Sequence, residues 1–106
     1  SMFNLLSKVF SPGEVIDFKQ LMKEGAVIID VRTVNEYQSG HVVKSKNIPL
    51  QQLSNQITSL NPHKPIIVCC ASGARSGSAK RMLQKAGFEN VVNGGGWMQL
   101  QNKLQE

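Results

Sequence analysis

Short apolar runs alternate with amphipathic segments along this chain. Residues 26–31 and 66–69 are almost continuously apolar, which is typical of strands buried on both faces of a sheet. Residues 91–92 form a shorter run of the same kind. Residues 50–60 and 76–86 instead carry apolar side chains at helical spacing. Because strands and helices follow one another in turn, the pattern predicts an α/β fold.

Capping residues locate two further helices. Asp17, with Gln20 three positions later, is a capping pattern for a helix that starts just after it. A start at Ser11 fits almost as well. Thr33 and Glu36 repeat the pattern for a short helix. The sequence therefore predicts one helix before the first apolar run and another directly after it.

Proline and glycine positions mark the remaining boundaries. Ile48 and Pro49 indicate a brief extended segment, and Gly87 is expected to end the second long helix. Three consecutive glycines occupy residues 94–96, where we expect the chain to turn into a closing segment that contains Trp97.

The chain of 106 residues has the size of one ordinary domain, and 41% of its residues are apolar. A chain of this size buries about 60% or more of its unfolded surface, so a core can form without disulfides or a structural metal. We interpret residues 1–10 as an N-terminal arm, with Ser1 as the remnant of an expression tag. Residues 11–106 form the predicted domain.

Charge and cysteine usage limit the expected partners and compartment. The formal charge is +5, but the basic residues are scattered and have no interleaved aromatic residues, so we expect no nucleic-acid partner. The two cysteines are adjacent rather than spaced as in a disulfide framework, and no signal-peptide core or membrane span is visible. We therefore expect a cytoplasmic location and no membrane partner. The positive charge favours the approach of a small anionic substrate.

The candidate chemistry lies directly after the second apolar run, where open α/β sheets place their ligand sites. The chain there passes through a loop of mostly small residues to the start of a helix. The loop consists of Cys70, Ala71, Ser72, Gly73, Ala74, Arg75 and Ser76. Small side chains let successive backbone N–H groups turn inward around an anion, and Gly73 permits a backbone angle that other residues resist. The loop is therefore a candidate anion site that begins with a cysteine.

Three features favour a thiolate at Cys70. They are the inward amides, the positive end of the following helix and the permanent cation of Arg75. A helix N-terminus or a nearby cation lowers the pKa of a cysteine from its free value of ~8.5. We therefore interpret Cys70 as a nucleophile and sulfur acceptor. The alternative, a small buried hydrophobic side chain, leaves the polar loop and Arg75 unexplained.

Two separated groups of residues resemble the rhodanese domain, and the resemblance extends over about residues 11–100. The first group comprises Asp30-Val31-Arg32, Glu36-Tyr37, Gly40-His41-Val42 and Asn47-Ile48-Pro49. The second group comprises Cys70-x-x-Gly73-x-Arg75-Ser76, then Leu83, Gly87-Phe88, Val91 and Gly95-Gly96 before Trp97. Either group arises by chance more easily than both together in the family's order and spacing.

The resemblance implies a small rhodanese-like domain with a central, mainly parallel sheet of about four to five strands and helices on both faces. It also implies a sulfurtransferase. Cys70 would take the outer sulfur of a donor such as thiosulfate, become a persulfide, and pass the sulfur to cyanide, a thiol or a protein. The amides of residues 71–76 would stabilise the anionic persulfide, and Arg75 would orient an anionic donor. We expect no cofactor and no metal.

Polar residues outside the loop are expected to support it. For Asp30, Arg32 and Glu36 we favour a polar network at the strand end that braces the active loop over a catalytic role. We interpret His41 in the same way, as a structural hydrogen-bonding residue rather than a general base or ligand.

The sequence departs from the family pattern in two places. Lys44-Ser45-Lys46 replaces small residues and adds positive charge, and Cys69 stands where an aromatic residue is frequent. Counted from Cys69, the motif is Cys-x5-Arg, the spacing of cysteine phosphatases, and some phosphatases and arsenate reductases share the rhodanese fold. Adjacent side chains of a strand point to opposite faces, so only one of the two thiols can face the loop, and Gly73-x-Arg75-Ser76 fits Cys70. A phosphatase or arsenate reductase that uses Cys69 and a non-catalytic binding module remain the alternatives.

Overall fold

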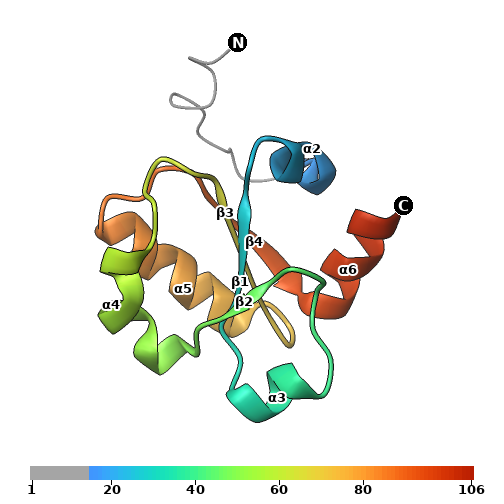
Figure 1. The fold of residues 1–106 in the computed structure, drawn as a ribbon, viewed down its shortest axis with the longest axis horizontal. Helices are drawn as coiled ribbons and strands as arrows, with labels where there is room; N and C mark the ends of the chain where they lie inside the picture. The colour runs from blue at the N-terminus through green and yellow to red at the C-terminus, as the bar shows by residue number, and fades with distance from the viewer. Residues whose placement is uncertain (1–14) are drawn as a thin grey trace.

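The computed structural model describes residues 15–106, which form a four-stranded parallel sheet with helices on both faces (Figure 1). The order across the sheet is β2-β1-β3-β4. The strands are β1 (Val27–Asp30), β2 (Lys46–Asn47), β3 (Ile66–Cys70) and β4 (Val91–Gly96). The α/β class and the parallel sheet predicted from the sequence are confirmed. The alternative helix start at Ser11 and the predicted boundary after residue 10 lie outside the described residues.

The two long apolar runs form the two central strands of the sheet. In β1 and β3, Ile28 pairs with Ile67 and Ile29 with Val68. Each of these four side chains is at most 1% exposed. A strand covered on both faces has no solvent side, so both of its alternating sets of side chains are apolar. This is why the runs show no period of two.

Among residues 15–106, five helices and two short 3-10 turns lie before, between and after the strands. The helices are α2 (Phe18–Lys23), α3 (Val34–Gln38), α4 (Leu53–Gln56), α5 (Ala74–Lys85) and α6 (Trp97–Gln105), and the 3-10 turns η1 (Leu50–Gln52) and η2 (Ile57–Ser59) flank α4. The side chain of Asp17 accepts the Gln20 N–H at 3.0 Å, and Thr33 and Glu36 form a reciprocal capping box. Both predicted capping patterns are confirmed, because each side chain satisfies an N–H that the first helical turn leaves free.

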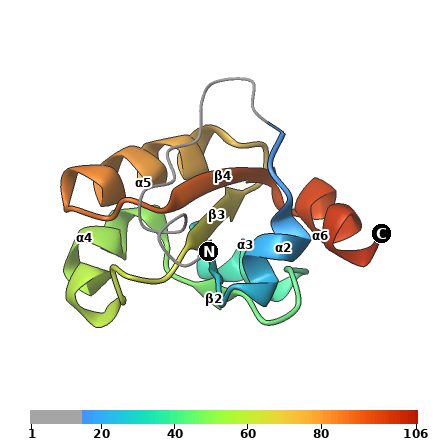
Figure 2. The ribbon, with the colours of Figure 1, turned by 90° about the horizontal axis from the view of Figure 1, so that it is seen from above.

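The two faces of the sheet carry separate apolar clusters. Figure 2 shows α4 and α5 on one side of the strands and α2 and α6 on the other. On one face, α4 and α5 pack Leu53 and Leu83 against the sheet, and this cluster includes Cys70. On the other face, α2 and α6 pack Leu21 and Leu100, and this cluster includes Cys69. The two neighbouring cysteines therefore belong to opposite faces of β3, as the alternation of strand side chains requires.

The predicted glycine turn at residues 94–96 is wrong, because these residues continue β4 to Gly96. Val68 pairs with Asn93, but Cys69 pairs with Gly95, so Gly94 is the extra residue of a β-bulge. A Cβ atom on Gly94 would lie 2.9 Å from Ile67 Cγ2 and 3.0 Å from Leu100 Cδ2. Glycine is thus required by close packing between β4 and its neighbours rather than by a turn.

Three other boundaries shift by one or two residues. Strand β3 continues through Cys70, and α5 begins at Ala74 rather than Ser76. The extended segment expected at Ile48 and Pro49 lies slightly earlier, as β2 at Lys46–Asn47. Element ends depend on tertiary hydrogen bonds as well as on local sequence, so shifts of this size are common.

Within residues 15–106, no helix is both long enough and apolar enough to cross a lipid bilayer.

The close packing of Gly94 makes a testable stability prediction. Gly94→Ala should lower the free energy of unfolding by about 1–3 kcal/mol, because the added methyl group overpacks the contact between β4, β3 and α6. Gly77→Ala is the matched control: its added Cβ would meet Asn93 Nδ2 at 3.5 Å, an ordinary contact, and alanine favours the α5 helix. Urea denaturation of both variants measures the difference, and equal losses of stability would contradict the packing argument.

Candidate active site

The thiol of Cys70 lies at the carboxyl end of β3 and accepts hydrogen bonds from the loop that follows. The N–H of Gly73 lies 2.9 Å from Cys70 Sγ, and the N–H of Ser76 lies 3.3 Å from it. The Ser76 hydroxyl is also 3.3 Å from Sγ. Two backbone N–H groups therefore donate to one sulfur atom, beside a hydroxyl group, and such an arrangement stabilises negative charge there.

The backbone at Gly73 makes this convergence possible. Gly73 has φ = +109°, in the left-handed region that residues with a side chain rarely adopt, and it immediately precedes α5. This bend turns the Gly73 N–H back toward Sγ. The Ser76 N–H belongs to the first turn of α5, where helical N–H groups have no partner within the helix and can bind an anion.

Hydrogen bonding, rather than solvent, favours the thiolate form of Cys70. Burial acts to raise the pKa of this thiol, because a thiolate loses water contacts there. The hydroxyl of Ser76 and the backbone N–H groups of Ser76, Gly73 and Ser72 oppose burial and, together, lower the pKa below its ordinary value. The residue is 1% exposed, so the thiolate depends on these protein donors.

The neighbouring cysteine has the opposite environment. Cys69 is fully buried in the cluster beneath α2 and α6, and burial, followed by the charge of Asp30, raises its pKa to about 12. Its thiol faces away from the loop of residues 71–76, on which a Cys-x5-Arg phosphatase would rely. The geometry therefore favours counting the loop from Cys70.

Arg75 pairs with Glu36 rather than with the sulfur. Its Nη1 and Nη2 atoms donate to the two carboxylate oxygens of Glu36 at 2.7 and 3.0 Å, and both side chains are 37% exposed. Hydrogen bonds from Arg75, followed by the backbone N–H of Thr33, lower the pKa of Glu36 to about 2. The bond to Glu36 is also the largest cause that raises the pKa of Arg75, and the charge of Cys70 adds to it. The cation expected from the sequence is thus near Cys70 but already partnered.

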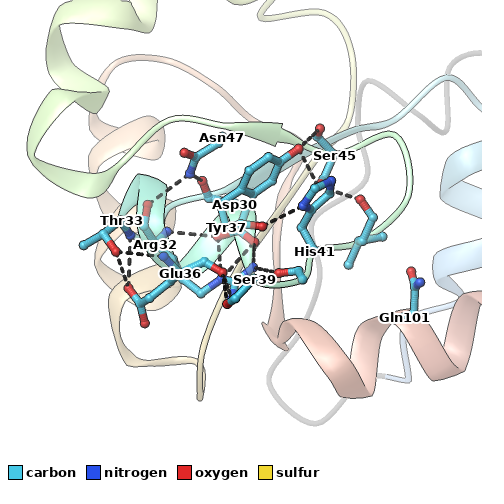
Figure 3. A network of polar contacts seen from close by, with 12 residues as sticks. Asp30, Arg32, Thr33, Glu36, Tyr37, Ser39, His41, Ser45, Asn47 and Gln101 are labelled. Carbon is cyan, nitrogen blue, oxygen red and sulfur yellow. Dashed lines mark hydrogen bonds and ion pairs between the residues drawn. The ribbon is translucent and has the colours of Figure 1, made fainter.

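A buried ion pair fixes α3 to the end of β1 (Figure 3). Arg32 Nε lies 3.0 Å from both oxygens of Asp30, and its Nη2 lies 2.7 Å from Oδ2. Arg32 also donates to the backbone carbonyls of Glu36 at 3.2 Å and Gly40 at 2.6 Å. The main chain of Glu36 is therefore held from β1, while its side chain reaches Arg75 in the loop. The supporting role expected for Asp30, Arg32 and Glu36 stays a prediction, and this connection is its structural basis.

The remaining candidate residues from the sequence analysis are exposed to solvent. Ala71, Ser72 and Ala74 are exposed at the surface of the loop. His41 is exposed, and its Nδ1 lies 2.7 Å from the carbonyl oxygen of Tyr37, on whose ring it stacks at 3.8 Å (Figure 3). These contacts are those of a structural side chain.

The sequence analysis did not single out Asn93, which organises the loop from β4. Its Nδ2 donates to the Gly73 carbonyl at 3.1 Å, and its Oδ1 accepts from the Ser76 hydroxyl at 2.6 Å and from the Gly95 N–H at 2.8 Å. Asn93 thus holds two of the residues that contact Cys70. A polar residue directly after the apolar pair Val91–Val92, inside a strand, was the available signal.

Comparison with known proteins identifies the family. The sequence pattern of the rhodanese-like domain family matches residues 14–103. Thiosulfate sulfurtransferase PspE of Escherichia coli K12 is 40% identical over 70 residues, which cover 64% of this chain and 67% of PspE. In Bacillus subtilis, the uncharacterized protein YqhL is 38% identical over 68 residues, and the putative sulfur carrier protein YrkF is 37% identical over 78 residues. These alignments cover 64% and 72% of this chain but only 54% of YqhL and 42% of YrkF, so the chain spans about half the length of these two relatives.

Solved structures give the same result. A rhodanese with anions from E. coli superposes with a TM-score of 0.66 at 36% identity. The superposition covers 70% of this chain and 89% of the E. coli rhodanese. A rhodanese-related protein from Thermoplasma volcanium superposes with a TM-score of 0.71 at 31% identity. This superposition covers 82% of this chain and 85% of the Thermoplasma protein. The family match extends over nearly all described residues, including the whole loop around Cys70. The chain belongs to the rhodanese-like domain family.

Proposed function

We propose that this protein is a sulfurtransferase that carries sulfane sulfur on Cys70. The observation that supports this most directly is the set of contacts on Cys70 Sγ: two backbone N–H donors, from Gly73 and Ser76, and the Ser76 hydroxyl surround a buried thiol. A nucleophile needs its anionic form, and the lowered pKa of Cys70 supplies more of it at neutral pH. The relatives named thiosulfate sulfurtransferase and putative sulfur carrier support the same chemistry.

The reaction takes place in two displacements at sulfur. The Cys70 thiolate attacks the outer sulfur of a donor such as thiosulfate, and the sulfur–sulfur bond of the donor breaks with its electron pair on the departing sulfite. The product is a persulfide whose outer sulfur carries negative charge. An acceptor anion, such as cyanide or a thiolate, then attacks that outer sulfur, and Cys70 leaves as the thiolate. Preorganised amides stabilise charge on sulfur in both steps.

Arg75 is the proposed contact for an anionic donor. Because Glu36 already occupies both terminal nitrogens of its guanidinium, the donor competes with Glu36 for this cation. Both side chains of this ion pair are more than a third exposed, so solvent limits the strength of the pair. Replacement of Glu36 by the donor at Arg75 therefore costs little free energy. Glu36 would then both position Arg75 and limit the affinity for anions.

The alternatives have less support. A phosphatase or arsenate reductase that used Cys69 would need a thiol that lies on the opposite face of β3 and has a raised pKa. A non-catalytic binding module would not need the hydrogen-bonded thiol of Cys70. We propose a cytoplasmic location, where cysteines stay reduced, with a thiol or a protein as the acceptor.

The choice between the two cysteines is tested by sulfur loading. After incubation with thiosulfate, intact mass should reveal one added sulfur on the wild type and on Cys69→Ser, but none on Cys70→Ser. Transfer to cyanide should follow the same order. Loss of the adduct in Cys69→Ser alone, or hydrolysis of an aryl phosphate without sulfur transfer, would contradict the proposed function.

The hydroxyl of Ser76 should set the acidity of the Cys70 thiol. Ser76→Ala removes the side-chain hydrogen bond that lowers the pKa of Cys70, so this pKa should rise by about one to two pH units, since a hydrogen bond to a charged group contributes about 1.5–3 kcal/mol. The rate of alkylation by iodoacetamide, measured against pH, reports this shift as a midpoint at higher pH. Ser78→Ala is the control, because the Ser78 hydroxyl accepts from Arg81 instead. An unchanged midpoint in Ser76→Ala would remove Ser76 from the mechanism.

Arg75 and Glu36 should affect thiosulfate in opposite directions. Arg75→Ala should raise KM for thiosulfate about tenfold, a loss of about 1.4 kcal/mol. Glu36→Gln frees the cation and should lower KM several-fold. Because the pKa of Glu36 is about 2, the carboxylate is charged throughout the assay range, and the Glu36→Gln effect should not vary between pH 6 and 9. Steady-state kinetics measures both variants, and a higher KM in Glu36→Gln would mean that Glu36 only braces the loop.

A further inference from the structure

The hydroxyl of Ser76 lies within reach of three acceptors but has one proton to donate. Its Oγ is 2.6 Å from Asn93 Oδ1, 3.1 Å from the Gly73 carbonyl oxygen and 3.3 Å from Cys70 Sγ. Ser76 is fully buried, so the hydroxyl has no contact with bulk solvent. The three acceptors therefore compete for a single hydrogen bond, and the direction of the hydroxyl determines how much it stabilises a thiolate.

Two other contacts fix the orientation of the Asn93 side chain. Its Oδ1 accepts the Gly95 N–H at 2.8 Å, and its Nδ2 donates to the Gly73 carbonyl at 3.1 Å. A rotated carboxamide would place its NH₂ group against a donor and its oxygen against an acceptor, so only one orientation satisfies both partners. Because Oδ1 has no hydrogen, the 2.6 Å contact with Ser76 is a hydrogen bond only when Ser76 donates.

Strand register brings Asn93 to this hydroxyl. Val68 and Cys70 are two positions apart in β3, and both belong to the apolar cluster beneath α4 and α5. Asn93 pairs with Val68, so its side chain lies on the same face of the sheet. The β-bulge follows directly, and the Gly95 N–H of the bulge donates to the Asn93 side chain. The bulge therefore helps to hold the carboxamide against Ser76.

The protonation state of Cys70 decides which of these hydrogen bonds forms. In the thiol, the S–H group donates to Ser76 Oγ while the Ser76 hydroxyl donates to Asn93, and all three side chains are satisfied. In the thiolate, Sγ has no hydrogen and is an anionic acceptor, which attracts the hydroxyl more strongly than a neutral oxygen does. Rotation of the hydroxyl to Sγ breaks the 2.6 Å hydrogen bond to Asn93. Asn93 therefore opposes the charged state of Cys70.

We propose that Asn93 is a positioning residue that controls the direction of the Ser76 hydroxyl and, through it, the reactivity of Cys70. The hydroxyl donates to Asn93 while Sγ is uncharged, and it donates to Sγ when Sγ is a thiolate. No covalent bond to hydrogen breaks in this change, because the hydroxyl only rotates.

The consequence for sulfur transfer rests on the proposed function. In the persulfide, the negative charge lies on the outer sulfur, so the hydroxyl returns to Asn93. The thiolate of Cys70 is the attacking group when sulfur is loaded and the leaving group when sulfur is passed on. Competition from Asn93 makes this thiolate more basic, and a more basic thiolate attacks faster and leaves more slowly. Asn93 therefore favours the loaded state of Cys70 over the empty one.

Charged side chains near Cys70 do not interfere with a test of this proposal. They form two ion pairs, Arg75 with Glu36 and Arg32 with Asp30. The thiol of Cys69 lies on the opposite face of β3, and β4, η1, α4 and η2 contain no titratable residue. Substitution of Asn93 or Ser76 leaves all of these charges in place. A change in the titration of Cys70 therefore reports the hydroxyl.

A double-mutant cycle tests the coupling of Asn93 to Ser76. Asn93→Ala should lower the pH midpoint of Cys70 alkylation by iodoacetamide by about 0.5–1 unit, because the hydroxyl loses its nearest competing acceptor. In the Ser76→Ala background the same substitution should leave the midpoint unchanged, since no hydroxyl remains. Equal shifts in the two backgrounds, or a higher midpoint in Asn93→Ala, would overturn the proposal.

Asn47→Ala is the matched control for loss of structural support. The Asn47 carboxamide donates to the carbonyls of Asp30 and Arg32, both at 3.0 Å, and has no hydrogen bond to Ser76. Both asparagine variants should be less stable to urea than the wild type, but only Asn93→Ala should shift the alkylation midpoint. A shift of the same size in Asn47→Ala would mean that weakened support, and not the hydroxyl, alters Cys70.

A measurement on the wild type requires no substitution at Asn93. The ¹³Cγ chemical shift of Asn93, followed against pH, should change with the midpoint of Cys70 alkylation, because Oδ1 loses the Ser76 hydrogen bond when the thiolate forms. This change should be absent in Cys70→Ser and should largely disappear in Ser76→Ala. A constant shift in the wild type, or a change of equal size in Ser76→Ala, would contradict the rotation of the hydroxyl.

The two half-reactions separate this inference from the proposed function. At equal thiolate concentration, Asn93→Ala should slow loading from thiosulfate about two- to threefold and should speed transfer from the persulfide to cyanide, since a less basic thiolate attacks more slowly and leaves faster. Changes in the same direction would contradict the positioning role. Failure of the wild type to load sulfur would instead overturn the proposed function, whereas the two titrations require no sulfur transfer.

Discussion

A buried sulfur atom can carry negative charge only if the protein replaces the hydrogen bonds that water would give it, and the site of this domain meets that requirement at Cys70. The donors come from the main chain of Gly73 and Ser76, and the Ser76 hydroxyl contacts the sulfur beside them. Their positions require a strand that ends at residue 70, a left-handed bend at Gly73, and a helix that begins directly afterwards. A change in any of these would move a donor away from Sγ.

Contacts from the two strands that flank β3, which are β1 and β4, hold the loop in place. Just beyond β1, Arg32 fixes the main chain of Glu36, and the Glu36 side chain holds Arg75. From β4, Asn93 holds the Gly73 carbonyl and the Ser76 hydroxyl. The loop itself consists mostly of small residues with little side-chain packing of their own, so its geometry depends on these neighbours. Such support is how an anion site made of backbone amides stays ordered before its ligand arrives.

Cys69 and Cys70 illustrate that the surroundings of a cysteine, and not its residue type alone, set the pKa of its thiol. They are adjacent in β3, both are at most 1% exposed, and their pKa values are shifted in opposite directions. Burial dominates for Cys69, which lies among apolar side chains beneath α2 and α6. For Cys70 the donors outweigh burial. Low solvent exposure therefore does not by itself predict an inert thiol.

The sequence by itself determined the α/β class, the two central strands, the helix caps at Asp17 and Thr33, and Cys70 as the candidate nucleophile. These features are local: an apolar run, a capping pair or a run of small residues has much the same meaning wherever it lies in the fold. Only the tertiary structure decided that residues 94–96 are packed strand rather than turn, that Arg75 is paired with Glu36, and that Asn93 organises the loop. Each of these joins segments far apart in the sequence, so its partner, and therefore its role, is fixed by the arrangement of the strands and not by neighbouring residues.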